Sequence, residues 1–359
     1  MILVINPGST STKVALFKDE KVLAEETIRH SVDELGTFKR VADQKNFRKK
    51  YIQIFLEKNE IELAHLKAIV GRGGLLRPIP GGTYAVNEAM LTDLENEMYG
   101  THASNLGAIL AYEIAKPLRI PTFIVDPVVT DELAKIARVS GLKGIERRSV
   151  IHALNQKAVA RKVLADRGIV YEKSRLIVAH LGGGVSIAAH QNGQMIDVVN
   201  ALDGEGPFSP ERTGTLPLVD FAQKIIGESL TLNDVKKCIA GEGGLKSYLG
   251  ETDLQNIEQW IKEGDEEAAF IVDAMSYQIA KGISEMAIPL KGHVDFILLT
   301  GGMSYSSYLT EKIIEKIDWL AEVQIYPGEH EMVALYLGAQ RVLEGKENAK
   351  TYEKGSVKQ

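Results

Sequence analysis

Three short turns of small and polar residues each follow an apolar run that predicts a β-strand. They read NPGSTSTK at 6–13, HLGGGVS at 180–186 and TGGMSYSS at 300–307. Glycine lets the backbone approach a ligand closely, and successive backbone N–H groups in such turns form anion-binding concavities. The first turn adds hydroxyl donors and a positive charge, from Ser9, Thr10, Ser11, Thr12 and Lys13. We therefore expect these turns to hold the phosphates of a nucleotide.

Two of the turns lie in segments that read alike, 3–26 and 176–199. Each predicts a strand, a small-residue turn, a second strand, a hairpin turn and a third strand; Asn192-Gly193 is a strong hairpin signal. Because any two β-meanders share some of this pattern, the likeness alone does not exclude chance. We interpret it as a duplication, which predicts two α/β domains with a nucleotide held between them.

Length and composition fit this picture. The chain has 359 residues, a formal charge of −6 and 45% hydrophobic residues, enough to build the cores of two domains. The acidic balance argues against a nucleic-acid partner. The basic runs at 47–50 and 146–148 are short, and we expect them on solvated surfaces.

Cysteine content and hydropathy bear on the compartment. Cys238 is the only cysteine, so an internal disulfide or a CxxC metal site is excluded, and we expect a buried, inert thiol. No apolar run approaches the roughly 18 residues of a membrane span, and the apolar start of the chain is too short for a signal peptide. These features favour a cytoplasmic protein.

The remaining elements follow from the hydrophobic pattern. We expect a long Gly/Pro-rich functional loop after the second meander, then a helix over 265–288, a buried strand over 294–302 and a helix over 308–320. The predicted domains are 1–165, with the first phosphate turn and the substrate side, and 166–345, with the nucleotide side. The last helix could cross back to the first domain, and 346–359 form a polar tail expected to fray.

Several familiar nucleotide motifs are missing. The sequence has no GxxxxGK[ST] loop, no strand–GxGxxG–helix unit and no HRD or DFG stretch of a protein kinase. HLGGG is similar to the oxyanion element of esterases, but no GxSxG accompanies it.

Longer motifs resemble the butyrate kinases of the acetokinase family. They are NPGSTSTK, GRGGLLRPIPGGTY at 71–84, RRSVIHALNQKAVAR at 147–161, AHLGGGVSIAAHQNG at 179–193 and YPGEHEMVALYLGAQRVL at 326–343. The resemblance runs from Ile2 to about Leu343. It implies two duplicated ribonuclease-H-like (actin-like ATPase) domains, each a mixed β-sheet with helices on both faces, and a cleft between them.

The resemblance implies a kinase that transfers the γ-phosphoryl of ATP to a carboxylate, with Mg²⁺. A fatty acid has a pKa near that of Glu, about 4.3, so it is ionised at pH 7 and needs charge neutralisation and alignment rather than a general base. By the same resemblance Arg72 grips the carboxylate, Arg212 stabilises the transferring phosphoryl, and His152 donates a hydrogen bond to it. Asp126 is also implied to be catalytic. Acetate kinases have FHGTSH where this chain has IHALNQ, so the second histidine of that motif is absent.

Further roles follow from the same match. His180 and the glycines Gly182, Gly183 and Gly184 are implied to face the nucleotide phosphates, and Gly301 and Gly302 to form the adenosine-side turn. Asn6 and Glu331 resemble the Mg²⁺-proximal pair, with Glu329 as an alternative to Glu331.

The acid that the enzyme prefers depends on a pocket next to Arg72, for which Leu75, Leu76 and Ile79 are the candidate lining. Two extra methylenes favour butyrate over acetate by about 1.6 kcal/mol. The resemblance makes butyrate the expected substrate, while branched four- and five-carbon acids, acetate and propionate stay open. A non-catalytic nucleotide-binding regulator of the same fold is a further alternative. The family implies a homodimer or larger oligomer, and we expect no nucleic-acid or membrane partner.

Overall fold

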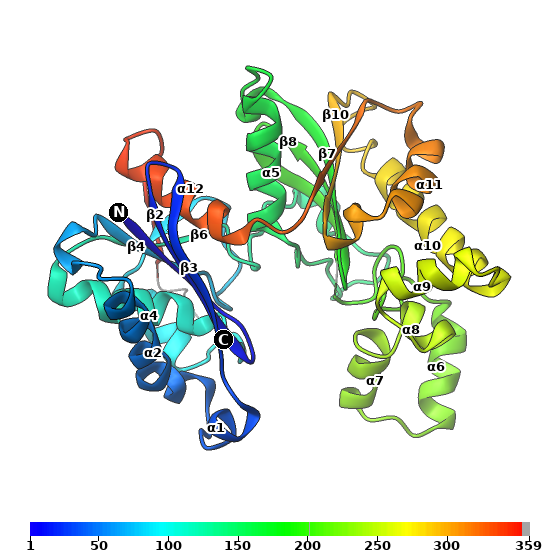
Figure 1. The fold of residues 1–359 in the computed structure, drawn as a ribbon. Helices are drawn as coiled ribbons and strands as arrows, with labels where there is room; N and C mark the ends of the chain where they lie inside the picture. Colours follow the sequence, from blue (N-terminus) through cyan, green and yellow to red (C-terminus); the bar gives the residue numbers. More distant parts are fainter. Residues whose placement is uncertain (201, 354–359) are drawn as a thin grey trace. The chain divides into compact units, whose positions relative to one another are not determined.

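The computed structural model describes residues 1–200 and 202–353, and the chain forms two compact units (Figure 1). The first unit comprises Met1–Thr130 and the chain from His330 onward, and the second comprises Asp131–Glu329. The expected division near residue 165 differs from this one. Helix α5 (Ala153–Ala165) packs on the sheet of the second unit, so the preceding segment belongs there. The last helix returns to the first unit, as the sequence allowed.

The first unit is built on a seven-stranded sheet in the order β12-β5-β6-β4-β1-β2-β3. Strands β1, β2 and β3 form an antiparallel meander, and β1 pairs in parallel with β4, which pairs in parallel with β6. The strands span β1 Ile2–Pro7, β2 Ser11–Lys18, β3 Lys21–Arg29, β4 Ala68–Arg72, β5 Thr83–Ala85, β6 Thr122–Val125 and β12 Lys350–Thr351.

Helices cover both faces of this sheet. Helix α12 (Glu331–Leu343) packs on one face against β1, β4 and β6, while α4 (Asn105–Ala115), with α2 (Lys45–Lys58) beside it, covers the other (Figure 1). Helix α4 lies so close to β4 that a Cβ added at Gly71 would be 2.1 Å from the Gly107 carbonyl oxygen. Two shorter helices are α1 Val32–Gly36 and α3 Glu88–Glu95.

The second unit repeats the meander. Its five-stranded sheet has the order β11-β10-β7-β8-β9, in which β7, β8 and β9 are antiparallel and β7 pairs in parallel with β10. The strands span β7 Arg175–Leu181, β8 Val185–Gln191, β9 Gln194–Val199, β10 Phe296–Gly301 and β11 Val323–Pro327.

The two meanders share fine detail as well as topology. Positive φ angles at Asp19 and Glu20 (49° and 64°) in one hairpin correspond to those at Asn192 and Gly193 (53° and 78°) in the other. Each second strand also carries a register shift at the same distance before its hairpin, after Leu16 in β2 and after Ala189 in β8. The predicted pair of duplicated α/β domains is confirmed.

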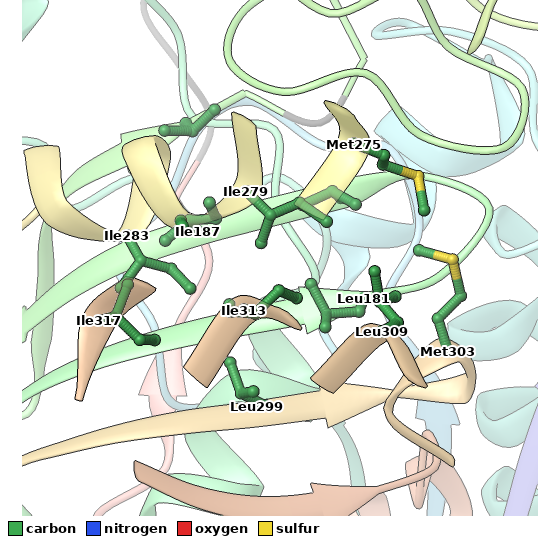
Figure 2. Packing of buried hydrophobic residues seen from close by; sticks show 14 of the residues in the cluster. Leu181, Ile187, Met275, Ile279, Ile283, Leu299, Met303, Leu309, Ile313 and Ile317 are labelled. Carbon is green, nitrogen blue, oxygen red and sulfur yellow. The ribbon is translucent and has the colours of Figure 1, made fainter. Parts of the chain in front are cut away.

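Side-chain alternation along β7 and β8 separates two layers in the second unit. On one face lies the large apolar core of Figure 2, where α10 (Glu266–Glu285) and α11 (Ser307–Ile317) cover the sheet. These helices and β10 confirm the elements expected near 265–288, 294–302 and 308–320. Residues alternating with the core, such as Leu176 and Val178, face α5 instead.

The long loop expected after the second meander is present, because β9 ends at Val199 and the next helix begins at Leu218. The helices that follow are α6 Leu218–Gly227, α7 Leu232–Ile239, α8 Gly244–Leu249 and α9 Leu254–Lys262. Six short 3₁₀ helices lie in the described chain, at Val41–Gln44, Leu63–His65, Lys116–Leu118, Lys135–Arg138, Tyr171–Lys173 and Gly302–Tyr305. Within the described ranges, no helix has the length and apolar character needed to cross a bilayer.

Three expectations need correction. Cys238 on α7 is only half-buried, and no other residue of that helix is fully buried. Arg48, in the basic run at 47–50, is fully buried. The polar tail does not fray where it is described: β12 pairs with β5, and Tyr352 is buried with its hydroxyl donating to Asp93 Oδ2 at 2.7 Å. The rest of the predicted tail, 354–359, lies outside the described residues.

Candidate active site

The first small-residue turn joins β1 to β2. The Gly8 N–H donates to the Ser11 carbonyl at 2.8 Å and closes the turn, while Ser9 and Thr10 are exposed at its tip. Lys13 lies on β2 directly opposite Asn6, and its Nζ is 2.6 Å from Glu25 Oε1 on β3. The turn therefore presents hydroxyl groups at the end of β1, with the lysine on the adjoining strand.

A charged cluster forms where β1, β4 and α12 meet. Arg72, at the end of β4, binds Glu331 through both terminal nitrogens, with Nη2 2.9 Å from Oε1 and Nη1 3.0 Å from Oε2. Asn6 donates from Nδ2 to Glu331 Oε2 at 2.7 Å. Glu331 occupies the first turn of α12, where the helix dipole favours a carboxylate. Three residues singled out from the sequence are thus brought together.

The alternative acidic residue, Glu329, lies in the second unit, where its carbonyl accepts from Asn155 Nδ2 at 2.7 Å. Glu331, in contrast, contacts Asn6. In the described chain, no three His, Cys, Asp or Glu side chains gather as a metal-binding set.

Asp126 follows β6 and is held by a reciprocal pair of bonds to Gly82. Its Oδ1 accepts from the Gly82 N–H at 2.6 Å, and its own N–H donates to the Gly82 carbonyl at 3.1 Å. The residue is buried and has a φ of 36°, which is uncommon for a residue other than glycine. Such strained positions cluster at functional sites. The contact with Gly82 ties the end of β6 to the turn that leads into β5.

The candidate pocket residues differ in exposure. Leu76 and Ile79 are buried members of the apolar core of the first unit. Leu75 is half-buried, and its N–H donates to Asn105 Oδ1 at 2.8 Å. Leu75 is therefore the one of the three with side-chain surface to offer a ligand.

In the second unit, two histidines stack. His180 on β7 and His152, which precedes the first residue of α5, have parallel rings with centroids 3.9 Å apart and 12° between their planes. Burial lowers the pKa of His180 to about 4, so this imidazole is neutral at pH 7. Asn155 Nδ2 donates to the carbonyls of Gly328 and Glu329, and its Oδ1 therefore accepts from Nδ1 of His180, at 2.8 Å.

A second hydrogen-bonded chain reaches His152. Gln156 Nε2 donates to the Ser186 carbonyl at 3.0 Å and to Ser186 Oγ at 3.1 Å, which fixes the orientation of its amide. Gln156 Oε1 must then accept from His190 Nε2, at 3.0 Å, and Tyr171 donates its hydroxyl to His190 Nδ1, at 2.7 Å. Ser186 Oγ lies 2.8 Å from Nδ1 of His152.

Sequence reasoning missed Asn155, Gln156, Ser186 and His190, although local signals for them exist. His152, Asn155 and Gln156 have the spacing of one helix face. His180, Ser186 and His190 fall on the side of β7 and β8 that faces α5, and His180 pairs directly with Ser186. The helical spacing along α5 and the alternation of side chains along β7 and β8 together could have predicted this buried polar layer.

The long loop brings Arg212 to the second small-residue turn. A Cβ added at Gly184 would lie 2.1 Å from Arg212 Nη1, so only glycine leaves room for this guanidinium. Ser209 donates from Oγ to the Gly183 carbonyl at 2.6 Å and holds the loop to the same turn. Burial lowers the pKa of Arg212, against the opposing effect of Glu211.

The third turn meets the second at the sheet edge. A Cβ at Gly301, which has a φ of 89°, would lie 2.4 Å from the Leu181 carbonyl oxygen. Apart from its chain neighbours, no atom of the described residues lies within 4 Å of a Cβ added at Gly302. The carboxyl ends of β7 and β10 thus carry adjacent glycine turns.

Comparison with known proteins shows the family of the chain. Residues 135–325 match the model of the acetokinase family. The chain is 59% identical over 358 residues to a probable butyrate kinase of Enterococcus faecalis, covering 100% of this chain and 99% of the relative. This chain belongs to the acetokinase family. Membership confirms the expected class of enzyme, a kinase with a carboxylate acceptor.

Solved structures show the same fold at low sequence identity. The crystal structure of Porphyromonas gingivalis acetate kinase has a TM-score of 0.79 and 20% identity, covering 94% of this chain and 98% of its own. A propionate kinase from Francisella tularensis has a TM-score of 0.72 and 18% identity, covering 93% and 97%. The actin-like fold expected from the sequence is confirmed.

Each unit thus has its own group of candidate site residues. Arg72, with Glu331 and Asn6, forms a partly exposed ionic cluster in the first unit. The stacked His152 and His180 form a hydrogen-bonding centre in the second, where Arg212 adds a cation at the glycine turn. Such groups neutralise and orient anions, which is what phosphoryl transfer between two anions requires.

Proposed function

We propose that this acetokinase family member is a butyrate kinase, which transfers the γ-phosphoryl of ATP to butyrate and forms butyryl phosphate and ADP reversibly. The main observation behind the proposal is that the Arg72 guanidinium already binds a carboxylate, that of Glu331, through two nitrogens. This geometry suits a substrate carboxylate equally well. The half-buried Leu75, three residues further on, offers apolar surface for a short acyl chain.

Each remaining group has a proposed role. Arg72 binds the carboxylate and lowers the repulsion between the two anionic substrates. Ser9, Thr10, Ser11 and Lys13 bind phosphate oxygens, as do the backbone N–H groups of Gly182, Gly183 and Gly184. Gly301 and Gly302 leave room for adenosine. Asp126 is a positioning residue, which holds the end of β6 through Gly82.

His152 donates from Nε2 to the oxygens of the transferring phosphoryl. The hydrogen-bonded chain supports this role. When the Ser186 hydroxyl donates a hydrogen bond to Nδ1 of His152, the N–H of the ring is on Nε2. His180, which the resemblance placed toward the phosphates, is buried and stacks on the ring of His152, so we assign it the orientation of that ring. Arg212 stabilises the negative charge of the same phosphoryl group.

The residues for a divalent cation are Asn6 and Glu331. One amide oxygen and one carboxylate fit Mg²⁺, which keeps several water ligands and takes others from phosphates. When bound, Mg²⁺ would neutralise phosphate charge.

The proposal is tested by trapping the acyl phosphate with hydroxylamine, in the presence of ATP and Mg²⁺, across straight and branched acids of two to five carbons. A hydroxamate signal that peaks at butyrate supports the assignment. A peak at isobutyrate or isovalerate would replace butyrate with a branched acid, and a peak at acetate or propionate would move the preference to shorter acids. ATP binding without a signal from any acid would indicate a non-catalytic regulator.

Self-association is also part of the proposal, since the family resemblance implies a homodimer or larger. An open groove of about 1320 Å³ in the second unit supports it. The exposed apolar residues Ile136, Val139 and Ile288 line this groove beside charges of both signs, Lys281 and Glu285, as a self-complementary face requires. Replacing Ile288 with Glu should halve the mass measured by sedimentation, and an unchanged mass would place the interface elsewhere.

A further inference from the structure

Arg48 on α2 is a buried cation behind the first small-residue turn. Its side chain has no exposed surface, although its neighbours in the basic run face solvent more. The spacing to Ile52, Phe55 and Leu56 places it on the buried face of the helix.

The guanidinium of Arg48 binds the backbone of the turn. Nη1 donates to the carbonyls of Gly8 at 2.9 Å and Ser11 at 2.8 Å, and Nη2 donates to the carbonyl of Ser9 at 3.1 Å. A further bond reaches Thr12 Oγ1 at 3.0 Å. The fork geometry of an arginine is needed to reach so many acceptors at once.

These bonds orient the turn. The remaining carbonyl, that of Thr10, accepts from the His30 N–H at 2.9 Å, so the protein satisfies the carbonyls of residues 8–11. In the part of the chain that the structure describes, the N–H groups of Ser9 and Thr10 donate to no other protein group, and both residues are exposed. The exposed side of the turn thus offers donors, which suits an anion.

The charge of Arg48 is not cancelled by a carboxylate. Among the described residues, no acidic side chain forms an ion pair with it. Its neutral partner Gln44, the residue directly before α2, accepts through Oε1 from Nε at 3.0 Å and from Nη2 at 2.9 Å. Burial lowers the pKa of Arg48 to about 10, which leaves it protonated at pH 7. A buried charge balanced only by dipoles is costly, and a bound anion offsets that cost.

We infer that Arg48 is a positioning residue for the nucleotide phosphates, which holds the turn at 8–12 in its donor-presenting conformation and supplies positive potential from behind it. This inference rests on the proposed phosphate role of that turn. It adds a residue that contacts the turn rather than the substrate, at a position where the sequence pattern predicted a solvated charge.

The test is Gln44→Glu, measured against Gln53→Glu. Both variants exchange an amide for a carboxylate, directly before α2 at residue 44 and within α2 at residue 53. Of the two, only residue 44 contacts Arg48, while Gln53 is exposed. The new carboxylate would pair with Arg48, keep its geometry and cancel its charge. We expect Gln44→Glu to keep its thermal midpoint and to raise the ADP dissociation constant, measured by calorimetry, about tenfold. Gln53→Glu should leave that constant unchanged.

Arg48→Lys is the second variant, because it keeps the charge and loses the fork. We expect it to raise the KM for ATP more than the KM for butyrate, since the acyl site does not depend on this turn. A folded Gln44→Glu protein with unaltered ADP affinity would overturn the role of the charge. Unaltered affinity in Arg48→Lys as well would reduce Arg48 to a structural residue.

Lys13→Ala and Ser11→Ala distinguish failure of this inference from failure of the proposed function. If they weaken ADP binding while the changes at residues 44 and 48 do not, the turn binds phosphate without help from Arg48. If none of these variants alters ADP binding, the turn is not a phosphate site, and the proposed role of the turn is wrong.

Discussion

The two units carry the same meander but surround it with different electrostatics. In the first unit the turn after β1 has a buried cation, Arg48, behind it, and the neighbouring strand end holds the Arg72–Glu331 ion pair. In the second unit the corresponding strand, β7, ends beside a neutral layer, in which His180 bonds to the Asn155 amide and Ser186 to the Gln156 amide, both on α5.

The difference follows from burial and from the helix behind each sheet. The neutral layer of the second unit is almost wholly buried. Because an unpaired charge in such a place costs much free energy, neutral donors in fixed directions are the stable choice. The ionic cluster in the first unit is partly exposed, with 33% of the Arg72 side chain and 18% of the Glu331 side chain accessible. A duplicated fold thus supplies two similar strand ends. A cation from α2 lies behind the first turn, whereas the second has a neutral layer against α5 and receives its cation, Arg212, from the long loop.

The largest effect is expected at the charged cluster. Arg72→Ala removes both donors to the carboxylate, and we expect kcat/KM for butyrate to fall by about 10² to 10³. Arg72→Lys keeps a charge but cannot bind in the bidentate fashion. Its kcat/KM should lie between those of the parent protein and Arg72→Ala. Steady-state assays measure both, with ADP affinity as the control for an intact fold. A loss of less than threefold in Arg72→Ala would remove this residue from the carboxylate site.

The next effect concerns Arg212, a cation at the glycine turn of the second unit. In Gly184→Ala the new methyl group would overlap Arg212 Nη1, so the guanidinium must move, and we expect kcat to fall by about 10². Gly227→Ala, at the end of α6, is the control outside the turn, because its new Cβ would meet no described atom beyond its chain neighbours and helix backbone within 4 Å. Equal activity of the two variants would contradict the assigned position of Arg212.

A smaller effect tests the neutral layer. Ser186→Ala removes the hydroxyl next to Nδ1 of His152 and should lower kcat by about tenfold, a typical share for one oriented hydrogen bond. Nitrogen NMR of labelled histidine reports the tautomer directly. We expect Nε2–H in the parent protein and a mixture in Ser186→Ala. An Nδ1–H signal for His152 in the parent would reverse the proposed direction of the chain.

The smallest effect is on stability and depends on pH. The native pKa of His180, about 4, lies below its value of roughly 6.5 in the unfolded chain, which therefore binds an extra proton between these values. The free energy of unfolding should fall as the pH drops from 6.5 to 4, by about 2 kcal/mol from this group at pH 5. Urea unfolding at pH 7 and pH 5 should show a smaller fall for His180→Gln. An equal fall in both proteins would mean that His180 is not buried as a neutral group.

The sequence predicted well those features that are encoded locally. Strand-ending glycine turns, the Asn192-Gly193 hairpin and the apolar spacing of α10 and α11 depend on neighbours within a few residues, and the structure has all of them. Arg72, Asn6 and Glu331 were found because family motifs mark them, yet their contact spans 259 residues between Arg72 and Glu331 and no local pattern shows it.

The failures have physical causes as well. Arg48 was placed among solvated charges because its basic neighbours dominated the run, although its spacing to Ile52 and Phe55 marked the buried face. Tyr352 was assigned to a fraying tail because the segment is polar, but one aromatic side chain and an edge strand anchor it to the first unit. In both places a single large side chain outweighed the average composition around it.

The most direct test of carboxylate kinase activity is ATP formation from ADP and butyryl phosphate in the presence of Mg²⁺. This is the favourable direction for an acyl phosphate, and luciferase luminescence measures the ATP. We expect rapid ATP synthesis by the parent protein, and we expect Arg72→Ala to lose this synthesis while it keeps its ADP affinity. Release of inorganic phosphate without ATP, or equal synthesis in the variant, would contradict a carboxylate kinase built around Arg72.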